Sequence, residues 1–103
     1  MTKTARKPRS MNDRELLGYT RRLAQHERQL HRLQLEAFIE VFNRKLPMKK
    51  GYSSLLTYLV KELGYSRAGA ARRNSVTKAA IRWPRLLDMI GDGELSLGSA
   101  SLL

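Results

Sequence analysis

The chain has 103 residues, the size of one ordinary domain, and leaves no room for a second independent core. Lysine and arginine number 20 against 9 aspartate and glutamate residues, so the formal net charge is +11. This balance favours a polyanionic partner, most commonly nucleic acid, because bound phosphates release condensed counterions. An anionic membrane surface and an acidic protein stay open as alternatives.

Cysteine is absent, which excludes disulfides and thiolate metal sites but fits either a reducing or an oxidising compartment. No run approaches the roughly 18 apolar residues of a membrane span, and the first ten residues lack the apolar core of a secretory signal. We therefore expect no membrane partner and a cytoplasmic, nucleoid-associated location.

Residues 1–11 form a basic segment that contains no acidic residue. They predict a disordered arm with two interpretations: a solvated tail that aids solubility, or an arm that lies on phosphates or in a minor groove. Its cationic residues, which we take as candidate DNA contacts, are Lys3, Arg6, Lys7 and Arg9.

A long amphipathic helix is predicted over residues 12–45, ending near Arg44 before Leu46-Pro47. Asn12 and Glu15 have the spacing of a capping box. One stripe on this helix follows alternating steps of three and four residues: Leu16, Tyr19, Leu23, His26, Leu30, Leu33 and Ala37. Two explanations stay open, a coiled-coil seam that forms a homodimer or packing onto the rest of the same domain.

Residues 51–103 predict a second set of shorter helices, so the whole fold is expected to be all-α. Ser53 can cap a helix that ends at Gly64, and Ser66 can cap a helix over 67–82 that Trp83-Pro84 closes. Further helices are expected over 84–90 and from Ser96. Because the chain ends inside this last pattern, we expect it to be a fragment of something longer.

The two helices around Gly64 have the arrangement of a helix-turn-helix, in which one residue of the turn takes a positive φ. The positions where such a motif needs buried residues are Leu59, Val60, Leu63, Tyr65 and Ala70. These observations predict a long helix followed by a helix-turn-helix bundle.

The second helix of this motif separates into a basic and an apolar face when it is projected at about 100° per residue. An arc of about 140° holds Arg67, Arg72, Ser75, Lys78 and Arg82. The opposite arc holds Gly69, Ala70, Val76, Ala80, Ile81 and Trp83, and no acidic residue stands between Ser66 and Arg85. Arginine can bond guanine edges bidentately, whereas lysine and serine can hold phosphates, so this face is typical of a recognition helix.

Arg73 and Arg85 complete the candidate DNA-binding residues. Arg73 projects into the apolar arc, where we expect its stem to pack while its head reaches solvent or a phosphate. The basic face carries no aromatic residue in this projection, which argues against base stacking of single strands.

Several short motifs in order resemble the helical N-terminal region of bacterial HNH-endonuclease-like proteins. They are GYSSLLTY from Gly51, ELGYS from Glu62, AARR from Ala70, Trp83-Pro84, and GELSL from Gly93. The segments LGYSR and GELSLG are also similar, more distantly, to the helix-turn-helix of ParB-type partition proteins. The resemblance covers about residues 46–103 and implies DNA association, with any HNH nuclease domain lying after residue 103.

No catalytic constellation is predicted within the chain. His26 and His31 would lie about 140° apart around a helix, so they do not share a face as a metal pair does. There is no glycine-rich phosphate loop either. We therefore expect no enzymatic activity, cofactor, metal or small-molecule substrate.

The leading hypothesis is a DNA-binding helix-turn-helix module that targets duplex DNA. Two alternatives stay open. One is a protein-interaction or dimerisation module that acts through the long helix, and the other is a small basic RNA-binding protein.

Overall fold

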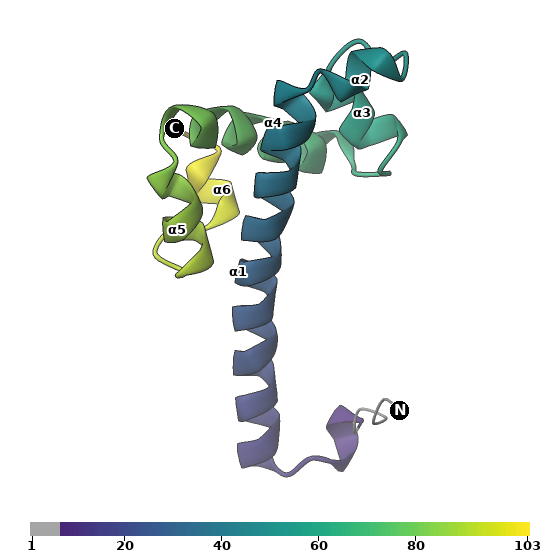
Figure 1. Ribbon diagram of the computed structural model, residues 1–103. Coiled ribbons are helices and arrows are strands. Elements are labelled where there is room, and N and C mark those ends of the chain that lie inside the picture. Colours follow the sequence, from purple (N-terminus) through teal and green to yellow (C-terminus); the bar gives the residue numbers. More distant parts are fainter. Residues whose placement is uncertain (1–6) are drawn as a thin grey trace.

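The computed structural model describes residues 7–103, and these residues form helices and connecting loops without a strand (Figure 1). The prediction of an all-α fold is therefore confirmed. The 3-10 helix η1 spans Pro8–Ser10 and the long helix α1 spans Asp13–Asn43. The remaining helices are α2 (Leu46–Lys49), α3 (Leu55–Lys61), α4 (Arg67–Arg82), α5 (Arg85–Gly91) and α6 (Leu97–Ala100).

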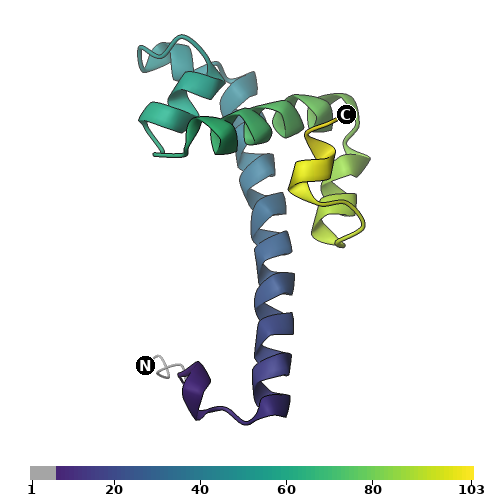
Figure 2. The ribbon, with the colours of Figure 1, turned by 180° about the vertical axis from the view of Figure 1, so that it is seen from behind.

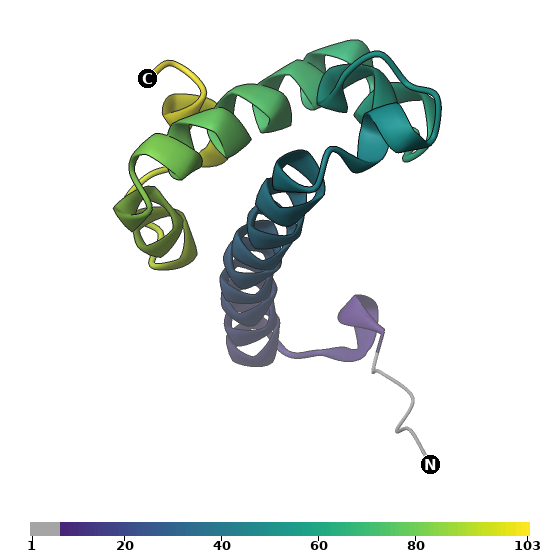
Figure 3. The ribbon, with the colours of Figure 1, turned by 45° about the horizontal axis from the view of Figure 1, so that its top comes forward.

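The helices are arranged as a bundle at the C-terminal end of α1. Seen from behind, α4 crosses the upper part of α1, with α3 at one of its ends and α5 and α6 at the other (Figure 2). From above, α2 to α5 follow one another in an arc around that end of α1 (Figure 3). The N-terminal half of α1 projects from the bundle, and among the described elements only η1 lies near its start (Figures 1 and 2).

The start of α1 has the capping box that the sequence predicts. The Asn12 side chain accepts a hydrogen bond from the Glu15 amide at 2.8 Å, and the Glu15 carboxylate accepts one from the Asn12 amide at 2.9 Å. The helix ends at the cap residue Arg44, after which Lys45 takes a left-handed φ of 56°. The short helix α2 then begins, which we did not predict; its proline is tolerated because the first helical turn needs no amide donor there.

The hydrophobic core lies where α1, α3, α4 and α5 meet. In α1 only Leu35 and Phe38 are buried, and they lie about 140° and about 80° around the helix from Leu30. The other buried apolar residues are Leu55, Leu59, Ala70, Val76, Ala79, Ala80, Leu86, Ile90 and Ala100. The core therefore uses the apolar positions in the C-terminal part of α1.

The predicted stripe of α1 does not pack within the domain. Leu23, Leu30 and Leu33 are 47%, 54% and 60% exposed, and His26 is exposed as well. Intramolecular packing therefore does not account for Leu23, Leu30 and Leu33, whereas the bundle covers Leu35 and Phe38, which belong to the apolar positions that widen this face toward the end of the helix.

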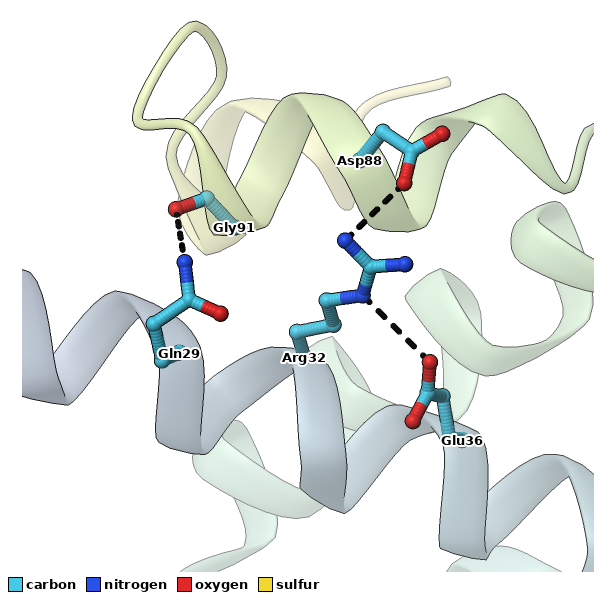
Figure 4. Close-up of polar contacts among 5 residues, drawn as sticks. All are labelled: Gln29, Arg32, Glu36, Asp88 and Gly91. Atoms are coloured by element: carbon cyan, nitrogen blue, oxygen red, sulfur yellow. Dashed lines mark hydrogen bonds and ion pairs between the residues drawn. The ribbon is translucent and has the colours of Figure 1, made fainter.

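Polar contacts fix α5 on the middle of α1 (Figure 4). The Gln29 side-chain amide donates to the Gly91 carbonyl oxygen at 2.9 Å. Arg32 places its Nη1 atom 2.9 Å from the Asp88 carboxylate and its Nε atom 3.3 Å from Glu36. Asp88 thus lies within α5 and pairs with α1.

The helix boundaries around Gly64 follow the prediction with small shifts. Ser54 rather than Ser53 caps α3, accepting from the Thr57 amide at 3.1 Å. Gly64 has a φ of +78°, as the turn requires, and Ser66 caps α4 by accepting from the Gly69 amide at 3.0 Å. Leu63, which we expected to be buried, is 44% exposed.

Two further boundaries differ from the prediction. Helix α5 begins at Arg85 rather than Pro84, because Pro84 occupies the cap position. Near the N-terminus, residues 8–10 form η1 instead of a disordered arm, and the Lys7 carbonyl accepts hydrogen bonds from both the amide and the hydroxyl of Ser10. Residues 1–6 lie outside the described part of the chain.

Candidate nucleic-acid interface

The outward face of α4 carries the cationic residues that the helical projection grouped together. Arg67, Arg72, Ser75, Lys78 and Arg82 are all exposed. None of the four cations forms an ion pair with another residue in the described range 7–103. Their charges are therefore available to an external anion. We call this surface the α4 basic face.

The opposite side of α4 anchors the helix in the core. Ala70 and Val76 are completely buried, and the Thr77 hydroxyl, also buried, donates to the Arg73 carbonyl at 2.7 Å. Ile81 and Trp83 depart from the prediction, because they are 37% and 52% exposed. Ala79 and Ala80 in the last turn of α4 are still buried, so only the end of the helix, at Ile81 and Trp83, leaves the core.

Arg73 is not part of the α4 basic face. Its guanidinium lies 4.3 Å from the centre of the Tyr65 ring, and Nη1 donates to the Gly69 carbonyl oxygen at 3.1 Å. Its Nε atom is buried and has no hydrogen-bond partner. The expectation that its head reaches solvent or a phosphate is therefore not met: Arg73 packs on the turn and steadies it.

A basic side chain that we did not select lies beside the N-terminal end of the face. Lys61 of α3 and Arg67 line one hollow of about 290 Å³, together with Ser53, Leu56, Thr57 and Val60. The sequence carried a signal for this, because Lys61 stands in the last turn of the helix that leads into the Gly64 turn. An anion in this hollow would meet two cations and two hydroxyl-bearing side chains.

Aromatic rings accompany the C-terminal end of the face. The Lys78 ammonium lies 5.9 Å from the centre of the Phe42 ring, and the Arg82 guanidinium lies 5.3 Å from that of Trp83. Trp83 and Arg82 line a hollow of about 240 Å³ that Ser75, Lys78, Ala79 and Leu103 complete. The expectation of a basic face without aromatic residues is therefore wrong at this end.

The acidic residue nearest to the turn is already engaged. The Tyr52 hydroxyl donates to Glu62 at 2.6 Å, and the Lys50 ammonium lies 3.8 Å from the same carboxylate oxygen. The hydrogen bond to Glu62 raises the pKa of Tyr52 above its usual value. The Tyr52 hydroxyl and the Lys50 ammonium thus partly offset the negative charge of Glu62.

The remaining candidate residues lie outside α4. Arg85 is exposed at the first position of α5. Lys7 and Arg9 lie at η1, near the end of α1 that is remote from the bundle (Figure 1). Lys3 and Arg6 lie outside the described residues. The structure therefore places Lys7 and Arg9 far from the α4 basic face, toward the other end of α1 (Figure 1).

Within residues 7–103, no group of three or more histidine, aspartate or glutamate side chains is placed to hold a metal ion. None of the helices described is both long and apolar enough to cross a bilayer. Comparison of the chain with protein-family models, with curated proteins and with solved structures found no match.

Proposed function

We propose that α3, the Gly64 turn and α4 form a helix-turn-helix that binds duplex DNA, with α4 as the recognition helix. The observation that carries this proposal is the α4 basic face, whose four exposed cations have no ion-pair partner in the described chain. A merely solvated face normally mixes both signs of charge, because interspersed charges favour solubility without a strong local field.

The dimensions of α4 agree with entry into a major groove. Its 16 residues give a rod of about 24 Å, and a B-form major groove admits an α-helix. Between Arg67 and Arg72 the exposed residues Ala68 and Ala71 are small, so the backbone can approach base edges. The first turns of the helix would then read bases, as in other helix-turn-helix proteins.

The ends of the face would hold the DNA backbone in this arrangement. Lys61 and Arg67 flank the hollow at the N-terminus of α4, where the helix dipole adds to the attraction for a phosphate. Lys78 and Arg82 lie toward the other end. Phosphate contacts of this kind supply affinity without sequence information, so we expect micromolar or weaker binding to arbitrary duplexes at physiological salt.

The resemblance to the N-terminal regions of HNH-endonuclease-like proteins is in keeping with this proposal. As part of it, we take the module to deliver DNA-binding affinity to the protein that carries it, without cleaving DNA itself. A nucleoid-associated location belongs to the same proposal.

The test compares two double variants that lose the same charge. Arg67→Ala/Arg72→Ala removes two cations from the α4 basic face, and Arg14→Ala/Arg21→Ala removes two exposed cations from the projecting half of α1. Fluorescence anisotropy with a labelled duplex is measured at several salt concentrations. We expect the first variant to bind at least about tenfold more weakly and to lose about 1 to 2 in salt slope, because each phosphate contact contributes about 0.9.

Circular dichroism provides the control that both variants remain helical. Equal effects of the two variants would show that binding follows overall charge and would overturn the proposal. The same measurement with single-stranded DNA and structured RNA distinguishes the RNA-binding alternative, since a major-groove reader should prefer duplex DNA.

A further inference from the structure

An exposed apolar stripe runs along α1 on a face that the bundle leaves open. Leu23, Leu30 and Leu33 are 47%, 54% and 60% exposed. They follow the alternating three- and four-residue spacing that Leu16, Tyr19, His26 and Ala37 continue in both directions. We call these seven residues the α1 stripe. It extends over about 31 Å of helix.

The stripe is self-complementary. Apolar residues repeating every 3.5 positions on average form the seam of a two-stranded coiled coil, in which the same residues of two helices face each other. The bundle packs around Leu35, about 140° from Leu30 around the helix, and its polar contacts reach Gln29 and Gln34 beside the stripe but leave Leu30 and Leu33 exposed. The N-terminal half of α1 also projects freely, apart from η1 near its start, among the described elements (Figures 1 and 2).

Charges beside the stripe favour a parallel, in-register pair. In that arrangement a residue on one flank of the seam lies beside the residue about five positions later on the other helix. Arg22 of each copy then lies beside Glu27 of the other. Neither residue has an ion-pair partner among the described residues of the single chain, so both are available.

Antiparallel registers bring like charges together. One register that keeps Leu16 to Leu33 in the seam puts Glu15 beside Glu36 of the second copy. A register shifted by one heptad puts Glu27 beside its own counterpart. Like charges at these flanking positions weaken a coiled coil, so the charge pattern selects the parallel pair.

We propose that a second copy of this chain covers the α1 stripe, so that two α1 helices form a parallel coiled-coil dimer. The dimer would be independent of DNA, and it would leave the α4 basic face of each copy free. It does not rest on the proposed DNA binding, and it is tested without DNA.

Disulfide trapping tests the parallel register, because the natural chain contains no cysteine. Leu16→Cys and Leu23→Cys should each form a cross-linked dimer under mild oxidation, since the same seam position faces itself in a parallel pair. Arg21→Cys, exposed on the same part of α1 but away from the stripe, is the matched control and should stay monomeric on a non-reducing gel. Cross-linking between Leu16→Cys and Leu33→Cys chains, without self-linking of either, would overturn the parallel arrangement.

Sedimentation equilibrium tests the dimer itself. Leu30→Lys should raise the dimer Kd by about a hundredfold, because it puts a charge into the seam while its effect on a monomer should be small at an exposed position. His26→Leu should lower the Kd by about tenfold, because it replaces the polar residue of the stripe. Arg22→Glu and Glu27→Arg should each weaken the dimer, and the two together should restore it. A wild-type chain that stays monomeric at high micromolar concentration would overturn the proposal.

Discussion

Two glycines at turns have the same left-handed backbone conformation but different surroundings. Gly64 has a φ of +78° and Gly93 a φ of +81°, so alanine at either position would take a left-handed conformation that costs about 1–2 kcal/mol. A Cβ atom on Gly64 would meet open space, whereas one on Gly93 would lie 2.8 Å from the Nε atom of Arg28. Arg28 must therefore move if Gly93 is replaced.

This difference gives a prediction on stability. Gly64→Ala should lower the free energy of unfolding by about 1–2 kcal/mol, and Gly93→Ala should lower it by more, because Arg28 has to leave its place against α5–α6. Urea denaturation followed by circular dichroism measures both. Adding Arg28→Ala should bring the cost of Gly93→Ala back toward that of Gly64→Ala; an unchanged cost would show that the contact with Arg28 does not matter.

The Tyr52–Glu62 hydrogen bond predicts an alkaline effect. Since the carboxylate raises the pKa of Tyr52 in the folded state, the bond contributes stability below the unfolded pKa of about 10. This contribution should be lost as the pH rises through the higher folded pKa. Tyrosinate absorbance of the wild type minus that of Tyr52→Phe isolates this group from the other tyrosines. Glu62→Gln should move its titration down; no movement would show that Glu62 is not the cause.

At the scale of elements, α4 and the N-terminal segment with η1 are two separate candidate surfaces for binding DNA. Deleting residues 1–10 removes cations that lie, where they are described, far from α4, and it should weaken all duplexes alike. Replacing Arg72 by alanine should cost about 1–3 kcal/mol on a preferred sequence and less on random DNA, if this side chain reads a base edge. Competition binding with both DNAs measures the difference. Loss of all binding on arm deletion, with no effect at Arg72, would make α4 a packing scaffold only.

The C-terminal end of α4 allows a test of strand preference. Trp83 is 52% exposed beside Arg82, so it could stack with an unpaired base. For a duplex-binding module we expect Trp83→Ala to change duplex affinity less than about twofold, because stacking contributes to unpaired bases. Anisotropy with single-stranded DNA should show whether Trp83 contributes there. A larger loss on single strands than on duplexes would favour the RNA-binding or single-strand alternative.

The sequence predicted local structure well where local chemistry decides it. Asn12 and Glu15 determine the start of α1 through their own hydrogen bonds, and Ser66 starts α4 at the predicted residue. Helix α2 was missed because Lys45, a non-glycine residue, adopts a left-handed backbone conformation just before the helix that contains Pro47. That conformation depends on tertiary packing, which local propensity does not contain.

The periodicity of α1 did not show which of its apolar residues pack within the domain and which stay exposed. Leu30 and Leu35 are equally apolar, and only the positions of α4 and α5 decide which of them is buried. Arg73 shows the same limit at the candidate site. Its place in the apolar arc was visible, but its partner, the Tyr65 ring, follows from the geometry of the turn.

At the scale of the whole molecule, the bundle and the projecting half of α1 should differ in rigidity. The long axis of 49 Å exceeds the other two extents of 29 and 26 Å, because α1 continues well beyond the helices that pack on it. Arg28, which lies against Gly93, and Gln29 and Arg32, which make polar contacts with α5, mark where this support begins. Toward the N-terminus from there, η1 is the only other described element near α1, so the helix relies chiefly on its own hydrogen bonds and on the cap at Asn12 (Figures 1 and 2).

Because only the C-terminal part of α1 packs against the bundle, amide hydrogen exchange should be fastest in the first turns of α1 and slow down toward Leu35. A helical stretch of about 14 residues without tertiary contacts is marginal in water, so amides before Gln25 should exchange through local fraying. Amides around Leu35 should exchange only when the whole bundle opens. Asn12→Ala should therefore accelerate exchange in the first turns while leaving the protection around Leu35 unchanged. Protection of the early turns that increases with protein concentration would report on the second copy through the backbone, with no substitution or cross-link.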